Sequence, residues 1–218
     1  NLSGAGLANT NLTGANLTGA NLSGAGLANT NLSGVDLKDL DLRHATLSDA
    51  DLSNANLTGA NLKDANLMHA NLIGANLTGA NLIDTYIWNV DLTGADLTGA
   101  DLTGARANLG DENLSGITSG SIIGTPTLPE GYFVINGYIV GPKVNLNGAD
   151  LQNSDLSGAI LSGIISGLIT GTPTLPENYS VINGYIIGPN VVLTGADLSG
   201  ANLTGADLTG ADLSRADL

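Results

Sequence analysis

The chain has 218 residues, of which 20 are acidic and 6 basic, so that its formal net charge is −14. Aromatic residues make up 3% of it and charged residues 12%, which argues against an ordinary globular enzyme. The acidic balance disfavours DNA, RNA and anionic lipid as direct partners, and no apolar stretch approaches the roughly 20 residues of a membrane helix.

A five-residue repeat runs from Leu2 to Leu102. Every fifth residue is Leu, except Ile87, and Asn or Asp precedes it at 17 of 21 positions. A period of five fits neither an α-helix nor one strand, but it fits a chain that turns at each unit and sends one Leu inward. Gly and Asn suit the corners of such a coil. Residues 1–10 recur unchanged at 21–30, which predicts four units per coil.

Units such as Ala95-Asp96-Leu97-Thr98-Gly99 resemble the pentapeptide-repeat family, whose pattern is A(D/N)LXX. The resemblance implies an all-β fold, a right-handed quadrilateral β-helix with four pentapeptides per coil. With the later positions that include Leu109 and Leu114, 33 central positions predict about eight coils, or a rod of roughly 40 Å. The Leu ladder replaces the missing aromatic core, and a polar residue at Leu57 or Leu77 is expected to break the stack locally.

The repeat is interrupted, and the interruptions predict five segments. A shift of two residues between Leu102 and Leu109 predicts a bulge or a loosened corner at Arg106-Ala107. Two larger interruptions are inserts that contain a hairpin. The predicted segments are β-helix over 1–116, a first insert over 117–143, a repeat coil over 144–163, a second insert over 164–190 and repeat coils over 191–218.

The two inserts are copies of each other, 47 residues apart. They contain all six prolines, the only Phe and four of the five tyrosines. Each has Asn-Gly between β-branched and aromatic runs, which predicts hairpins of 132–135 with 138–140 and of 179–182 with 185–187. An isolated hairpin is marginally stable, so each is expected to pack on the rod, on the other hairpin or on a partner.

No residue pattern indicates catalysis, a cofactor or a metal site. His44 and His69 are the only histidines, and we expect both at exposed corners of adjacent faces. A catalytic triad needs a nucleophile, a base and an acid that converge, and nothing in the repeat directs such convergence. No Gly-Lys-Ser/Thr follows the glycines, so phosphate binding is not indicated. We therefore interpret the chain as not an enzyme.

Candidate interaction residues are aromatic residues of the inserts and aspartates of the coils. They are Tyr132, Phe133, Tyr138, Tyr179, Tyr185, Asp91, Asp96, Asp101, Asp197 and Asp217. At a period of 20, Asp36 and Asp96 share a face with Asn between them, whereas Asp197 and Asp217 stack directly. Residues 1–35 carry no charge, so the acidic groups are dispersed and form no continuous strip.

Three functions remain open on these grounds. The first is a non-enzymatic structural or protein-interaction rod. The second follows from the resemblance, because gyrase-protecting relatives are acidic rods that mimic DNA; those relatives commonly carry Phe at the central position, whereas this chain has Leu at 32 of 33. The third is adsorption to ice or another regular lattice through outward Thr13, Thr18, Thr93, Thr98 and Thr103.

The expected partner is another protein or a second copy of the chain, in an end-to-end or side-by-side assembly. A β-helix needs capped ends, and neither end looks like a cap, which favours sequence beyond this chain over assembly through its ends. Because there is no cysteine, the redox compartment cannot be read, and the cytoplasm is the default expectation.

Overall fold

The structure is a computed structural model that describes residues 1–108, 114–124, 126 and 128–218. The chain divides into two compact units, residues 1–129 (unit 1) and residues 130–218 (unit 2). Within the described residues, no helix is both long and apolar enough to cross a bilayer. The division into the five predicted segments and the count of about eight coils remain predictions.

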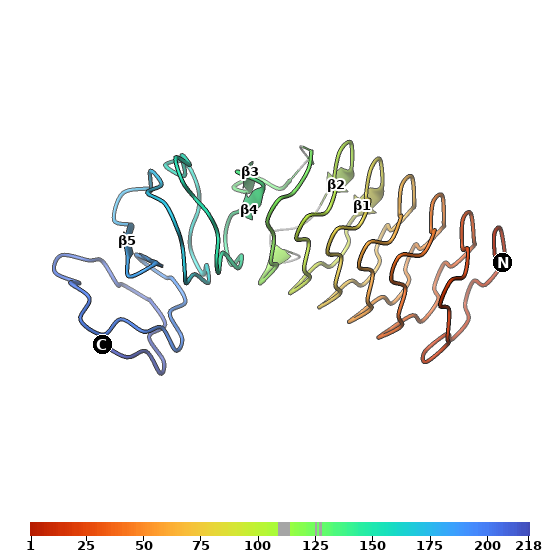
Figure 1. Cartoon of the computed structure of the whole chain (residues 1–218), viewed down its shortest axis with the longest axis horizontal. Coiled ribbons are helices and arrows are strands. Elements are labelled where there is room, and N and C mark those ends of the chain that lie inside the picture. The colour runs from red at the N-terminus through yellow and green to blue at the C-terminus, as the bar shows by residue number, and fades with distance from the viewer. Residues whose placement is uncertain (109–113, 125, 127) are drawn as a thin grey trace. The chain divides into compact units, whose positions relative to one another are not determined.

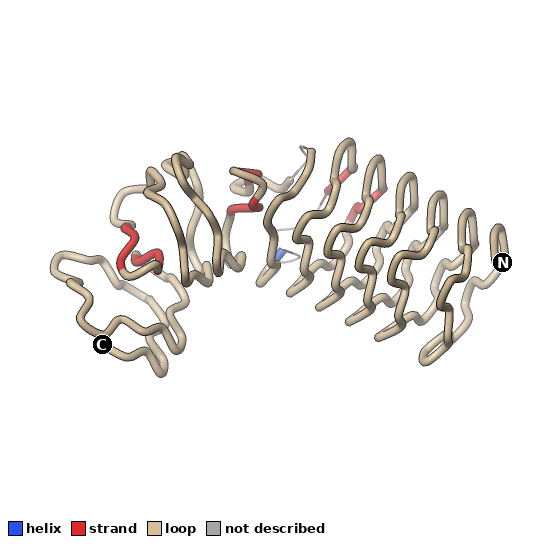
Figure 2. Tube along the Cα trace, in the orientation of Figure 1, coloured by secondary structure: helices blue, strands red, loops and turns tan. Residues whose placement is uncertain are grey.

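Unit 1 is a β-helix whose successive coils run parallel to one another (Figure 1). Residues 20 apart are bridged, as in Asp36↔Asn56 and Asn56↔Asn76, which confirms four five-residue units per coil. Most neighbouring coils are joined by bridges of single residue pairs. Among the described residues of unit 1, continuous strand pairing occurs between β1 (Tyr86–Trp88) and β2 (Arg106–Asn108) (Figure 2). The ladder bonds are short, for example 2.7 Å from the Leu57 N–H to the Asn76 carbonyl.

The corners and the Asn or Asp positions have a common local explanation. In the described coils of unit 1, the second residue after the central residue adopts a left-handed backbone, with φ of 66° at Gly4 and 56° at Asn54. The Asn or Asp before the Leu accepts a hydrogen bond from the backbone N–H two residues ahead, as Asn76 does from Thr78 at 3.0 Å. Asp and Asn both offer this oxygen, so they interchange without a change of fold.

The core is a column of Leu with Ala beside it. Leu57 and Leu77 are fully buried, and so are alanines two places before the central residues of the inner coils, such as Ala55. At position 85 Thr replaces this Ala and is still fully buried. Its hydroxyl is satisfied because it donates a hydrogen bond to the Leu82 carbonyl at 2.6 Å. Burial of Leu contributes about 1.5–3 kcal/mol per side chain, which lets the repeat fold without aromatic residues.

The register shift in unit 1 lies beyond the predicted place. Arg106 and Ala107 pair with Tyr86 and Ile87 at the regular offset of 20, so the predicted bulge at Arg106-Ala107 is wrong. Further along, the Gly94 N–H donates to the Ser115 carbonyl, two residues more than the regular offset. The two additional residues therefore enter after Asn108. Leu109 lies outside the described residues, and Ala107 stands opposite Ile87 in the central register.

Unit 2 contains repeat coils and two antiparallel hairpins. The first pairs β3 (Phe133–Ile135) with β4 (Tyr138–Val140), and the second pairs β5 (Ser180–Ile182) with β6 (Tyr185–Ile187). The Asn-Gly sequence of each forms the turn, where φ is 49° at both Asn residues and close to 78° at both Gly residues. Both hairpins thus lie where Asn-Gly predicts turns, and their first strands begin one residue later than expected.

Candidate functional site

The second hairpin is seated on the neighbouring coil by a substituted core position. Ser166 stands where the repeat would place Leu, and it is 4% exposed. Its Oγ accepts the N–H of Ile186 at 2.9 Å. At the hairpin turn the Gly184 carbonyl accepts the N–H of Ile169 at 2.8 Å. Ile186 and Ile187 are buried, so apolar residues of β6 fill space that a Leu would otherwise fill.

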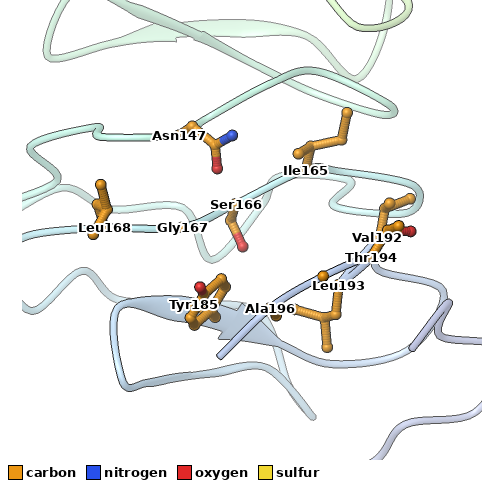
Figure 3. Close-up of a pocket in the computed structure, with 11 residues that line it drawn as sticks. Asn147, Ile165, Ser166, Gly167, Leu168, Tyr185, Val192, Leu193, Thr194 and Ala196 are labelled. Atoms are coloured by element: carbon orange, nitrogen blue, oxygen red, sulfur yellow. The ribbon is translucent and has the colours of Figure 1, made fainter. Parts of the chain in front are cut away.

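A groove opens beside this hairpin, between residues 165–168 and residues 192–196. The two segments are bridged at Ile165 and Val192 and separate beyond that bridge (Figure 3). The cavity has a volume of about 440 Å³, and Tyr185 of β6 lines it. Buried Leu193 and Ala196 also line it, so the groove reaches down to the core. We refer to it below as the second-hairpin groove.

Two aspartates bond residues of the second-hairpin groove, Asp212 through its carboxylate and Asp197 through its backbone N–H. The Thr194 hydroxyl donates to the Asp212 carboxylate at 2.9 Å, and the Tyr185 hydroxyl accepts the Asp197 backbone N–H at 3.2 Å. Hydrogen bonds from Ser214, and then from Thr194, hold the pKa of Asp212 below its usual value. Bonds from the Ser199 hydroxyl and N–H likewise lower the pKa of Asp197. Both groups are therefore negative at neutral pH, next to a largely apolar groove.

The four predicted tyrosines bond within the chain. The Tyr132 hydroxyl donates to the Pro142 carbonyl at 3.0 Å. Tyr132 is buried, and its ring lies so close to Gly141 that a Cβ there would meet it. Tyr179 repeats this bond with Pro189, and burial raises the pKa of Tyr179, with a smaller effect from Asp207. Tyr138 accepts the Asp150 N–H at 3.0 Å, as Tyr185 accepts that of Asp197. Tyr138 and Tyr185 therefore link their hairpins to the following coil, whereas Tyr132 and Tyr179 bond within their own inserts.

Phe133 differs from the tyrosines because its side chain faces solvent. It is 44% exposed and lines a shallow hollow of about 240 Å³ with Asp155 and Ala159. Ile160, which is 51% exposed, follows Ala159 directly. Phe133 is thus the one aromatic candidate of the hairpins whose ring is placed mainly for outside contact.

The predicted aspartates mostly serve the turns. Asp91, Asp96 and Asp101 lie on successive sides of the coil and accept N–H bonds from residues two ahead, Thr93, Thr98 and Thr103. Each is bridged to an Asn one coil before, so the structure brings none of these three carboxylates together. Asp197 and Asp217 are bridged directly, and both are exposed, as the period predicts.

The two histidines occupy exposed corners, which confirms their predicted placement. Their φ angles are 58° at His44 and 60° at His69. The His44 Nδ1 lies 3.9 Å from the Asp64 carboxylate, and both side chains are exposed, so this contact contributes little to stability. Among the described residues, no three His, Asp or Glu side chains are close enough to hold a metal ion.

The sequence predictions missed the second-hairpin groove and its exposed apolar residue, Leu168. This Leu is 79% exposed and occupies a corner position, with φ of 54°. Corners elsewhere in the repeat carry Gly, Asn, Asp, His or, at position 215, Arg, so an aliphatic residue at this place was a readable exception. The corresponding residue of the first insert is Ser121, with φ of 51°. The comparison of the two inserts would therefore have singled out Leu168, but not the groove, which depends on contacts across coils.

Comparison with known proteins supports the repeat assignment. The family model described as "Pentapeptide repeats" matches eight copies, over residues 1–39, 36–74, 65–109, 143–164 and 190–218. These ranges span well over half of the chain. A search of curated proteins found no match.

Three solved structures illustrate the likeness. A pentapeptide repeat protein from the thylakoid lumen of Arabidopsis thaliana is 29% identical, with 49% of this chain and 70% of that chain covered and a TM-score of 0.41. HetL of the cyanobacterium Nostoc, involved in heterocyst differentiation regulation, is 29% identical. The match covers 100% of this chain and 86% of HetL, with a TM-score of 0.28. Full-length QnrB1, a plasmid-mediated fluoroquinolone resistance protein, is 15% identical. The match covers 86% of this chain and 84% of QnrB1, with a TM-score of 0.32.

The assignment rests on the repeat model and on the coil geometry, since these superpositions are weak. The repeats imply the right-handed β-helix of such proteins. The matched repeats over residues 1–109 cover the stretch in which bridges join residues 20 apart, and the chain belongs to the pentapeptide repeat family.

Proposed function

We propose that this chain is a non-enzymatic β-helix scaffold that binds a protein partner through unit 2. The observation that carries the proposal is the placement of apolar side chains around the hairpins. The hairpin tyrosines bond within the chain, whereas Leu168 and Phe133 are exposed beside hollows of the surface. Exposed apolar residues next to concave surface are typical of protein interaction sites.

The two inserts supply a matched test. Phe133 in the first hairpin corresponds to Ser180 in the second, 47 residues later, and both are exposed on equivalent strands. The substitution Phe133→Ser therefore places in the first hairpin a residue that the same backbone already accommodates. Leu168→Asn places at the second-hairpin groove a residue that suits a left-handed corner.

The experiment uses the full chain as immobilised bait, with captured proteins quantified by mass spectrometry and the binding then reconstituted from purified components. We expect a partner that binds wild type saturably and is reduced by Phe133→Ser, by Leu168→Asn or by both. Thr98→Ser, on unit 1, is the control and should leave binding unchanged. The proposal fails if no captured protein binds saturably when purified, or if neither unit 2 substitution affects the binding.

Self-association is a distinct form of the same proposal, because the partner would then be a second copy. The mass of the purified chain in solution separates the two forms. A monomer at all concentrations excludes the second copy as partner, whereas a concentration-dependent dimer weakened by Phe133→Ser would identify it.

A second proposal is that the chain mimics DNA toward a DNA-handling enzyme such as gyrase. The net charge of −14 favours it. The alternation of Asp with Asn along the bridged columns weakens it, since only Asp197 and Asp217 form a direct pair among the candidate aspartates. A gyrase supercoiling assay tests this proposal, and no inhibition or protection at micromolar protein would sink it.

A further inference from the structure

The parallel ladder is interrupted inside the second-hairpin groove. One coil before it, the Gly148 N–H donates to the Gly167 carbonyl at 2.7 Å. One coil after it, the Gly195 N–H donates to the Ser214 carbonyl at 2.9 Å. The bond between these two would run from the Leu168 N–H to the Thr194 carbonyl. Within the described part of the chain, neither group has a hydrogen-bond partner, although both residues line the groove.

Leu168 is held in a backbone conformation that its side chain does not favour. Its φ of 54° lies in the left-handed region, which is unfavourable for residues with a Cβ. Among the described non-glycine residues with positive φ, it is the only aliphatic one. The side chain is 79% exposed, so burial does not offset this cost. Ser121 adopts the same conformation at the corresponding position, so the fold does not require Leu there.

The walls of the groove are apolar next to these two backbone groups. Val192 is half-buried, and the ring of Tyr185 is held in place by its bond to the Asp197 N–H. The residue 47 positions before Val192 is Asn145, and the one before Leu168 is Ser121, so these two apolar residues have polar counterparts at the first hairpin. The carboxylate of Asp212 accepts a hydrogen bond from Thr194 of this lining and would attract a cation.

We propose that the second-hairpin groove binds an extended peptide segment of a partner protein, by strand addition at the interrupted ladder. A peptide group offers one carbonyl and one N–H, which complement the Leu168 N–H and the Thr194 carbonyl. An apolar side chain of the segment packs against Leu168 and Val192, and a neighbouring Lys or Arg faces Asp212. This inference rests on the proposed protein-binding function and names the chemistry of the partner.

The test is selection of a phage-displayed library of linear heptapeptides on the full chain, with depletion on the Leu168→Asn chain. We expect enriched peptides with an apolar residue beside Lys or Arg. The synthetic form of the best peptide should bind Leu168→Asn and Val192→Asn about tenfold more weakly than wild type. Methylation of single backbone nitrogens of the peptide should abolish binding at one position, where the N–H bonds Thr194.

Two controls separate a binding role from a folding role. Leu168→Asn should unfold at the same temperature as wild type or at a higher one, because Asn accepts the left-handed corner better than Leu. Ser121→Asn introduces the same residue at the corresponding corner of the first insert and should leave peptide affinity unchanged. If Leu168→Asn lowered the unfolding temperature, Val192→Asn would decide the result.

The inference is overturned if no peptide is enriched, or if the enriched peptides bind wild type and both groove variants equally. The proposed function stands even then, provided that the full chain captures a partner whose binding is weakened by the Phe133→Ser substitution. If the chain captures no saturable partner at all, the proposed function fails as well. The two failures are therefore distinguishable.

Discussion

The hydroxyl of Tyr185 accepts the backbone N–H of Asp197 at 3.2 Å, and Tyr138 makes the same bond to Asp150 at 3.0 Å, 47 residues earlier. In each case a hairpin side chain supplies an acceptor to a backbone N–H of the following coil. An unpaired backbone N–H is costly where water cannot replace the acceptor. Each tyrosine is therefore a structural residue of its insert, in addition to any role that Tyr185 has in the groove.

Substitution of Tyr185 by Phe removes this acceptor and keeps the ring. We expect the free energy of unfolding to fall by about 0.5–1.5 kcal/mol, the usual net contribution of one hydrogen bond. Hydrogen exchange measured by NMR should show faster exchange at the Asp197 amide. Tyr138→Phe is the matched variant and should act alike on Asp150. Unchanged exchange at both amides would contradict the assigned role.

Truncation of a central Leu should be far more costly than any surface change. Leu57 is fully buried within a regular stretch of coils, and Leu57→Ala leaves a cavity that neighbouring coils cannot close. We expect a loss of about 2–5 kcal/mol in urea unfolding. Leu168→Ala, at a side chain that is 79% exposed, serves as the control and should change stability by less than about 0.5 kcal/mol. Equal losses would show that the Leu column does not form the core.

The sequence was sufficient for the regular coils because each physical requirement recurs every five residues. Leu at the centre, Ala beside it and Gly or Asn at the corner all indicate one coil geometry, and the bridges of Asn56 to Asp36 and Asn76 confirm the period of 20. The Asn-Gly turns of the hairpins were readable for the same reason, since a local requirement for positive φ has a residue signature.

The departures from the repeat were not readable because they depend on contacts between distant residues. The register shift lies beyond Arg106 because Arg106 and Ala107 still pair with Tyr86 and Ile87, whose partners the sequence does not mark. The buried state of Tyr132 depends on its fit against Gly141. The groove at Leu168 results from the interruption of a ladder across coils, which periodicity alone does not describe.

Acid should destabilise unit 2 through its turn aspartates. Hydrogen bonds from the Ser or Thr two residues ahead hold the pKa values of Asp155, Asp197, Asp207 and Asp212 below the reference value of 3.8. A carboxyl whose pKa is lower when folded stabilises the fold above its unfolded pKa, and this contribution is lost as the pH falls through the folded pKa. Urea midpoints should therefore hold between about pH 7 and pH 5 and fall below about pH 4.

The matched control for this acid effect is Asp→Asn at two of these positions. The double variant Asp197→Asn, Asp212→Asn keeps the turn oxygen, as Asn does throughout unit 1, but it cannot titrate. Its urea midpoint should depend less on pH below about pH 4 than that of wild type. A double variant with the full acid dependence would show that other groups cause it.

The corner position of His44 should accept only residues that tolerate a left-handed backbone. Its φ is 58°, the side chain is exposed, and the contact with Asp64 is weak. His44→Asn should therefore leave the unfolding free energy within about 0.5 kcal/mol of wild type, since Asn54 occupies an equivalent corner with φ of 56°. His44→Val should lower it by about 1–3 kcal/mol, because a β-branched residue is strained at positive φ. If Val and Asn were equivalent in urea unfolding, the corner geometry assigned to His44 would be incorrect.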